Sequence, residues 1–438
     1  LGAAAFLFRA WSVPPAEGLT ALGGAIAVDR YSVFFRLVLL GIAAIGILLS
    51  SHYLARTGES RGEYYALLLF ATTGMMLLAA AADLLVVFLA LEVLSLSLYV
   101  LSGFSRRRLA SQEAGLKYFL LGAFSSAFFL YGVAMAYGAT GTTSLGGIAD
   151  ALSGQPGSLS LMLTAAALLS VGFAFKVAAV PFHMWTPDVY QGAPTPVTGF
   201  MAAGTKVAAF AALIRVATVA LGPVGWELGA ALAIIAALTM VVASVLAIAQ
   251  DDVKRLLAYS SIAHAGFVLV GVAAGNQEGI SGAMFYLVAY AAMILGAFGV
   301  VILVSRVGEQ RTSLRSYRGL ARRSPVLAGL LTIFLLSLAG IPPAAGFMAK
   351  FFVFQAAVNE GMEWLVIVAV LASVVAAFFY LRVLVLCYME EPDPEPAEAV
   401  AEGAPGFAIA VAAVVTLALG VLPGLLLDPL QTAGVLRW

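Results

Sequence analysis

The sequence carries little charge for its length, and this scarcity sets the class of protein. Of 438 residues, 11% are charged and 62% hydrophobic, with a mean hydropathy of +1.02. A soluble domain carries about 25% charged residues, so this chain has too little polar surface to face water on all sides. Apolar runs near the ~20 residues that span a bilayer recur throughout. The sequence predicts an all-α polytopic membrane protein, because barrel strands are only ~10 residues of alternating character.

Cysteine, histidine and net charge are also scarce, and each shortage excludes a kind of site. Cys387 is the only cysteine, which excludes an internal disulfide and a cysteine-ligated metal or iron–sulfur centre. The histidines His52, His183 and His264 show no metal-ligand spacing. Glycine-rich nucleotide-binding motifs are absent, and zero net charge offers no basic surface to nucleic acid. We therefore expect no cofactor in this chain.

Apolar runs between polar breaks predict about 12 complete transmembrane helices. Prolines interrupt two of these runs, at Pro181 and Pro187 and at Pro342 and Pro343, which predicts two broken helices. Residues 1–10 resemble the end of a helix and carry no signal-peptide pattern, so we expect the natural chain to begin earlier. The predicted spans lie near 31–54, 63–82, 83–103, 113–138, 158–190, 195–220, 227–249, 254–274, 279–305, 325–360, 362–389 and 405–427.

The distribution of basic residues predicts the orientation in the membrane. When loops are assigned alternately to two sides, only Arg9, Arg30 and Arg437, near the chain ends, fall on the Arg-poor side. The positive-inside rule makes the Arg-rich side cytoplasmic and puts the C-terminus on the opposite side. The Arg-rich side collects Arg56, Arg61, Arg106, Arg107, Arg108, Lys254, Arg255, Arg306, Arg311, Arg315, Arg318, Arg322 and Arg323.

The order of the spans predicts an internal symmetry. Two units of five helices each have a proline-broken fourth member, and an odd number of helices makes the second unit inverted, an architecture typical of transporters. The second members carry Glu92 and His264 respectively. We predict N-terminal helices over 1–62, a first repeat over 63–220, an inverted repeat over 227–389, an acidic cytoplasmic linker over 390–404 and a C-terminal helix over 405–438.

Five ionisable residues lie deep within predicted spans and form the candidate site. Lys206 follows Thr195 by eleven residues, ~16 Å at the helical rise and close to the midplane. A charge there costs about 2.5–3.5 kcal/mol. A desolvated lysine can release its proton whereas arginine cannot, so lysines at depth indicate proton transfer. The candidates are Glu92, Lys176, Lys206, His264 and Lys350. Lys176 and Lys350 lie beside the helix breaks.

Structural interpretations of the same residues stay open. Glu92 would serve equally as fixed interhelical glue to a lysine, and His264 as a hydrogen-bond donor that never titrates. Lys117 and Arg382 near the cytoplasmic ends, and Arg215 toward the opposite face, are placed to extend to the headgroups.

Three stretches resemble the antiporter-like subunits of proton-pumping respiratory complex I, most closely the N type. They are FKVAAVPFHMWTPDVYQGAPTPVTGFMAAGTKVAAF from Phe175, KRLLAYSSIAHAGF from Lys254 and GIPPAAGFMAKF from Gly340. The resemblance runs from about residue 20 to the C-terminus. It implies a 14-helix fold with two inverted five-helix repeats. The first helix of the family fold and most of the second, which lie outside the repeats, are missing here.

The resemblance also implies roles. A glutamate like Glu92 partners the broken-helix lysine matching Lys176, and the lysines matching Lys206 and Lys350 continue the relay, with a histidine matching His264 nearby. Flavin (FMN), iron–sulfur clusters and most of the quinone site would belong to partner subunits, with M and K types as neighbours in a bacterial inner membrane. Two alternatives remain: a subunit of a cation/proton antiporter or ion-pumping hydrogenase, and a passive structural element.

Overall fold

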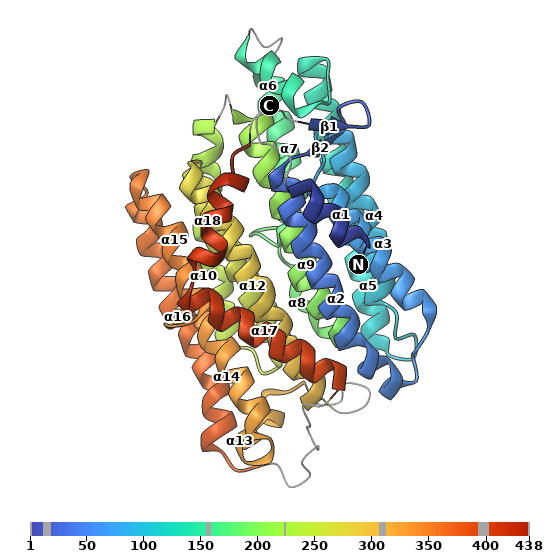
Figure 1. The fold of residues 1–438 in the computed structure, drawn as a ribbon, viewed down its shortest axis with the longest axis vertical. Coiled ribbons are helices and arrows are strands. Elements are labelled where there is room, and N and C mark those ends of the chain that lie inside the picture. The colour runs from blue at the N-terminus through green and yellow to red at the C-terminus, as the bar shows by residue number, and fades with distance from the viewer. Residues whose placement is uncertain are drawn as a thin grey trace.

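The structure, a computed structural model, is a bundle of long helices (Figure 1). It describes residues 2–11, 19–154, 159–222, 225–305, 312–392 and 403–436. Within those ranges, ten helices are long and apolar enough to cross a membrane. They include α2 (Arg30–Thr57), α4 (Leu84–Ser102), α5 (Leu109–Thr140), α7 (Leu159–Val177), α9 (Thr195–Arg215) with its π-helical extension η1 (Val216–Ala220), α10 (Gly225–Ile248), α11 (Val253–Ala274), α12 (Gln277–Val304), α16 (Glu363–Met389) and α17 (Gly403–Val421).

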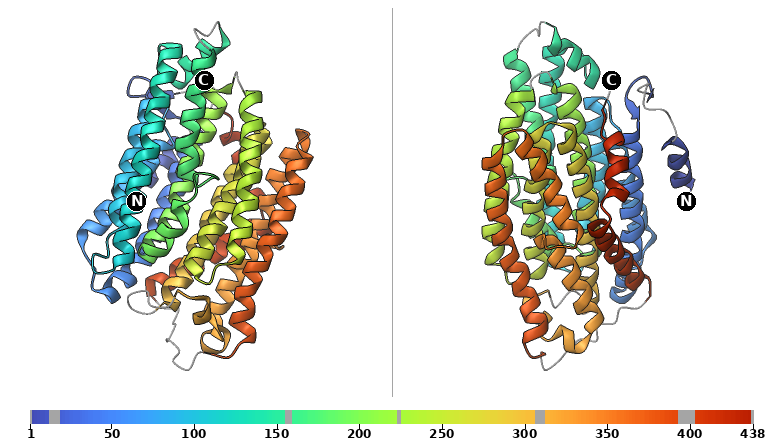
Figure 2. Two further views of the ribbon diagram at one scale, coloured as in Figure 1. Left: turned by 180° about the vertical axis from the view of Figure 1, so that it is seen from behind. Right: turned by 60° about the vertical axis from the view of Figure 1, so that its left-hand side comes forward.

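Shorter elements complete the bundle, and several were not predicted. A two-stranded hairpin precedes α2, a helix occupies the expected loop 139–157, and the predicted last span divides at Pro423 into α17 and α18. The shorter elements are α1 (Gly2–Trp11), β1 (Leu19–Ala21), β2 (Ile26–Val28), α3 (Gly62–Leu78), α6 (Leu145–Ser153), α8 (Trp185–Gly192), η4 (Leu314–Tyr317), α13 (Leu320–Arg323), α14 (Pro325–Ala339), α15 (Ala345–Asn359) and α18 (Gly424–Ala433). Figure 2 shows α1 at the edge of the bundle, where it packs on α2.

The predicted all-α membrane fold is confirmed, and each predicted span coincides with a helix or a broken pair of helices. The number of complete crossings stays a prediction, because α3 and α14 are shorter apolar helices. Much of the predicted linker, residues 393–402, lies outside the described residues, as do Arg306, Arg311 and Arg437. The side chain of Arg9 is likewise not described.

Both predicted helix breaks are present. The first separates α7 from α8 and contains the cis Val180–Pro181 bond; the second separates α14 from α15 and contains the cis Pro342–Pro343 bond. Proline cannot donate to the preceding turn and its ring clashes there, so neither helix continues through the break. Gly340 ends α14 with φ +90°, a left-handed conformation that other residues rarely adopt. The half-helices α7, α8, α14 and α15 therefore each have an end inside the bundle.

The order of packed helices is the same in the two predicted repeats. In the first, α3 packs on α4, α4 on α5, α5 on α7, and α9 on both α3 and α7. In the second, α10 packs on α11, α11 on α12, α12 on α14, and α16 on both α10 and α14. This correspondence supports the predicted repeats, whose boundaries stay a prediction.

An aspartate–threonine clamp begins the second helix of each unit. Asp83 caps α4 by accepting from the Leu85 amide at 2.8 Å, and its other oxygen accepts from Thr143 at 2.6 Å. The next residue, Leu84, donates its amide to the Thr143 carbonyl at 2.9 Å. The first clamp thus joins the start of α4 to the segment that follows α5.

The second clamp repeats these bonds at the other end of the bundle. Asp252 caps α11 through the Arg255 amide at 2.9 Å and accepts from the Thr312 hydroxyl, while Val253 donates to the Thr312 carbonyl at 2.8 Å. Serine follows the threonine in both clamps and caps the next helical element, α6 or η4. The first clamp adjoins α6 and the second lies near α13, at opposite ends in Figure 1.

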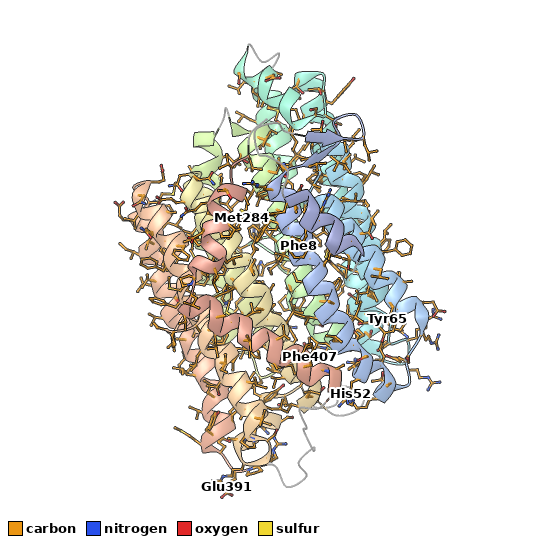
Figure 3. All side chains as sticks on the ribbon, in the orientation of Figure 1. Phe8, His52, Tyr65, Met284, Glu391 and Phe407 are labelled. Carbon is orange, nitrogen blue, oxygen red and sulfur yellow. The ribbon has the colours of Figure 1, made fainter. Side chains whose placement is uncertain are left out.

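Charged side chains gather at the end that holds α13. Figure 3 shows His52 and Glu391 in this lower part of the view and Met284 toward the other end. At this end Arg318 pairs with Glu390 at 2.6 Å and Arg382 pairs with Asp251 at 2.7 Å. The middle of the bundle is apolar and close-packed, with α9, α11 and α12 almost entirely enclosed. The deep ionisable side chains lie in this enclosed region.

Candidate functional site

The five predicted residues lie on five helices that meet in the enclosed part of the bundle. Lys176 is at the end of α7, Lys206 on α9, His264 on α11 and Lys350 on α15, and each is at most 5% exposed. Glu92, on α4, is partly buried. The lysines are not isolated charges, because each is hydrogen-bonded at or beside a helix break.

Lys176 and Glu92 each form a hydrogen bond with a different serine. The Lys176 Nζ donates to the Ser95 hydroxyl at 2.7 Å, and Ser95 lies three residues after Glu92 on the same face of α4. Ser126 of α5 donates to the Glu92 carboxylate. Among the described residues, Glu92 and Lys176 form no direct ion pair or hydrogen bond with each other, although they interact electrostatically. Their coupling in this arrangement is therefore indirect.

Aromatic rings surround the Lys176 ammonium. It lies 5.4 Å from the centre of the Tyr118 ring and 5.8 Å from that of Tyr99. Electron-rich ring faces attract a cation within about 6 Å. The rings replace part of the hydration that the buried charge has lost.

Lys206 caps the first half-helix. Its Nζ donates to the carbonyl oxygen of Val177, the last residue of α7, at 2.7 Å. Carbonyls at a helix C-terminus lack partners within the helix and carry the negative end of its dipole, which favours a cation. Because Val177 follows Lys176 in the chain, the end of α7 joins the two lysines.

Lys350 caps the corresponding half-helix of the second unit. Its Nζ donates to the Ala339 and Leu338 carbonyls at 2.8 and 3.3 Å, at the end of α14, and to the Ser373 hydroxyl at 2.6 Å. The ammonium also lies 4.7 Å from the centre of the Phe267 ring. The same electrostatic device therefore operates at both breaks.

His264 lies between the two capping lysines and interacts electrostatically with both. Its Nδ1 is 2.7 Å from the Tyr286 hydroxyl and its Nε2 is 3.3 Å from the Tyr380 hydroxyl, which also bonds Ser260. Buried hydroxyl groups on both sides of the ring therefore hold the imidazole in place.

A fourth buried lysine and several serines also make buried polar contacts here and were not predicted. Lys254 is fully buried and donates to the Ala193 carbonyl at 2.6 Å, at the end of α8. The spacing of Ser95 from Glu92 is a signal that the sequence contains. Ser126, Ser373 and Lys254 reach their partners across helices, and no local pattern points to those partners.

Arg215 does not extend to the membrane surface, so the alternative interpretation was wrong for this residue. It is 1% exposed and makes two bonds to Asp29, of 2.7 and 2.9 Å. Burial acts to raise the pKa of the Asp29 carboxyl, but the charge of Arg215 outweighs it and holds that pKa below its usual value. The pair fastens the end of α9 to the start of α2.

Lys117 and Arg382 are partly exposed, but each has protein partners. Lys117 pairs with Glu113 and Asp188 at 2.7 and 2.8 Å. Arg382 donates to the Ile248 carbonyl at 3.1 Å, at the end of α10. Neither side chain is committed only to headgroups.

Among the described residues, no group of three His, Cys, Asp or Glu side chains is arranged to hold a metal ion.

Known proteins with this arrangement decide the family. Residues 81–376 match the family described as NADH:quinone oxidoreductase/Mrp antiporter, TM. The chain is 46% identical to NADH-quinone oxidoreductase subunit N of Trichlorobacter lovleyi, over 95% of this chain and 85% of that protein. The chain belongs to the subunit N family of NADH-quinone oxidoreductases. The resemblance found in the sequence is confirmed.

Solved structures agree with the family. A chain of respiratory complex I from Thermus thermophilus superposes with a TM-score of 0.82 at 41% identity, covering 98% of this chain and 91% of that one. A chain of the Mrp complex from Dietzia sp. gives a TM-score of 0.83 at 24% identity, covering 93% and 84%. The second likeness shows the fold alone. Members of the subunit N family are membrane subunits of complex I, so this chain works with other subunits of that assembly.

Proposed function

We propose that this chain moves protons across the membrane as quinone is reduced elsewhere in the complex, using Glu92, Lys176, Lys206, His264 and Lys350. The observation that carries the proposal is the buried lysine that caps a half-helix at each break. Lys206 caps one break and Lys350 caps the other, and His264 interacts electrostatically with both. A proton relay needs groups that exchange protons, with apolar packing that prevents leakage.

Two opposing effects make the lysines suitable carriers. Burial penalises the ammonium form by about 2.5–3.5 kcal/mol at the bilayer centre. The half-helix ends at Val177 and Ala339 favour the same form. Because the two effects oppose each other, a change in a neighbouring charge shifts the balance between the loaded and the unloaded lysine.

The resemblance and the distribution of arginines support the finer parts of the proposal. The Arg-rich loops face the bacterial cytoplasm, the C-terminus lies on the opposite side, and M- and K-type subunits flank the chain. FMN, iron–sulfur clusters and most of the quinone site lie in partner subunits. An antiporter subunit remains the alternative function, but the Mrp chain shares only the fold at 24% identity.

The test is NADH-driven proton uptake by inverted membrane vesicles that carry Glu92→Gln or Lys206→Ala. We expect assembled complexes to lose most quinone reduction and proton uptake together. Arg107→Ala, in an exposed loop, is the control and should behave as wild type. Assembly is checked on a native gel. Normal assembly with both activities at wild-type level would show that these residues are structural.

A further inference from the structure

Glu92 and Lys176 do not touch each other, and serine side chains lie near both of them. Lys176 gives one of its bonds to Ser95, and Glu92 receives its bond from Ser126. The two charged groups belong to α4 and α7, and Ser126 comes from α5, which packs on both helices. A proton passing between them needs an intermediate carrier on the α5 side.

A small cavity lies on that side. Lys176, Ser125 and Ser126 line it, and the remaining lining is apolar and includes Phe129 and Phe175. Its volume of about 10 Å³ is at the lower limit for one water molecule, which needs two to four polar partners. Three of the lining residues, Lys176, Ser125 and Ser126, carry polar side-chain groups.

Ser125 is poised to serve such a water. Its side chain is 6% exposed, and within the described part of the chain its hydroxyl has no hydrogen-bond partner. Ser97, by contrast, donates to the Val93 carbonyl of its own helix. The hydroxyl of Ser125 is therefore available to the cavity.

We propose that Ser126, together with one water in this cavity, carries the proton between Lys176 and Glu92. The proposal rests on the proton-transfer function proposed above. The Lys176 ammonium gives a proton to the water, the water passes one to the Ser126 oxygen, and the original Ser126 proton moves to Glu92. A neutral amine, a carboxylic acid, an intact water and an intact hydroxyl remain. The reverse sequence restores the charged pair.

Serine suits this position because a hydroxyl both donates and accepts. Valine has nearly the shape of threonine but no hydroxyl, so the two substitutions separate proton transfer from packing. Ser125 also lines the cavity, but among the lining serines only Ser126 has a hydrogen bond to the Glu92 carboxylate, and apart from Lys176 the rest of the lining is apolar. Ser126 is thus a catalytic residue of the relay, since it touches the proton-accepting carboxylate.

The experiment compares Ser126→Val with Ser126→Thr in the assembled complex. We expect the valine variant to lower NADH-driven proton uptake about 100-fold, the lower end of what a positioned proton-transfer group contributes. The threonine variant should stay near wild type. The solvent deuterium isotope effect on uptake should rise only in the valine variant, since proton transfer then limits the rate. Ser97→Val, which loses only a bond within its own helix, is the control.

Equal rates in the valine and threonine variants, whether both normal or both low, would overturn the proposal. If the valine variant fails to assemble, Ser126→Ala replaces it, and an alanine rate equal to that of threonine has the same meaning. Glu92→Gln separates this inference from the function on which it rests. Normal uptake in Glu92→Gln refutes the relay itself, whereas loss there with normal uptake in Ser126→Val refutes only the role of Ser126.

Discussion

The two five-helix units share a scaffold but differ in the chemistry mounted on it. Counting from the clamps, Glu92 and Ser95 lie nine and twelve residues after Asp83, and the same offsets from Asp252 lead to Ser261 and His264. Ser261 therefore stands at the position of Glu92, and His264 stands at the position of Ser95, which binds Lys176. The second unit thus has no carboxylate at the position from which Glu92 acts on its lysine.

The helix caps differ in a related way. Lys206 and Ser373 both lie nine residues before an arginine, Arg215 or Arg382, on the last helix of their units. In the first unit the lysine itself reaches the end of α7, whereas in the second the serine reaches α14 and the lysine comes from the broken helix. The repeated scaffold fixes where a cation is held, and the side chains decide which charges accompany it.

The largest expected difference between the units concerns stability at their arginines. Asp29→Asn should destabilise the chain by about 3–5 kcal/mol, because the buried Arg215 loses its carboxylate. Asp251→Asn should cost about 0–1 kcal/mol, since the Asp251 side chain is 83% exposed. The thermal unfolding temperature of the purified complex, followed by native gel, measures both. Equal losses would mean that the two arginines have equivalent surroundings.

Acid sharpens the same comparison. The pKa of Asp29 is lower in the folded chain than the unfolded value of about 3.9, so its stabilisation is complete above about pH 4. It is lost as the pH falls through the lower, folded value. Wild type should therefore lose stability in this acidic range, and Asp29→Asn should lose less over the same range.

The next largest difference concerns proton transfer at matched positions. Glu92→Gln should lower NADH-driven proton uptake about 100-fold, as loss of a positioned proton-transfer group does. Ser261→Ala, at the same offset in the second unit, should keep most of the rate, because no carboxylate is lost there. Uptake by inverted vesicles measures both, normalised to assembled complex. A severe loss in Ser261→Ala would show that the second unit uses a hydroxyl where the first uses an acid.

The smallest expected effects test the shared scaffold. Thr143→Val and Thr312→Val should each destabilise by about 1 kcal/mol, the net contribution of one hydrogen bond. Thr143→Ser and Thr312→Ser keep the hydroxyl and should therefore retain most of the stability that the valine variants lose. Chemical unfolding of the detergent-solubilised complex provides the measurement. A large inequality between the two valine variants would argue against equivalent clamps.

Much of the fold was predictable because its signals are local. Apolar length gave the spans, and Pro181 and Pro343 marked the breaks, since proline acts on its own helix. The hairpin formed by β1 and β2 was missed, because three-residue strands have no periodicity to detect. The helix α6 was missed for a similar reason, being only nine residues long within a polar loop.

The burial of the candidate lysines was predictable, but their contacts were not. Scarce lysines at depth identified Lys176, Lys206 and Lys350 without any knowledge of neighbours. The partner of Lys206 is a backbone carbonyl, which every residue carries, so no side-chain pattern singles out Val177. Arg215 meets Asp29 across 186 residues of chain, and its proximity to a helix end suggested a headgroup instead. The depth of a residue follows from its position within an apolar run, whereas its contacts depend on tertiary packing.

The complete enclosure of α9 has a consequence for biogenesis. Every residue from Thr195 to Arg215 is buried, and this helix has the lowest hydropathy of the ten candidate spans in the described chain. Its neighbours include α2, α3 and α7, which are synthesised earlier, and α12, which is synthesised later. The ribosome therefore delivers α9 before its enclosure exists. We expect nascent chains that end before Gln277 to hold Lys206 beside lipid or the translocon, and to be retained there until α12 arrives.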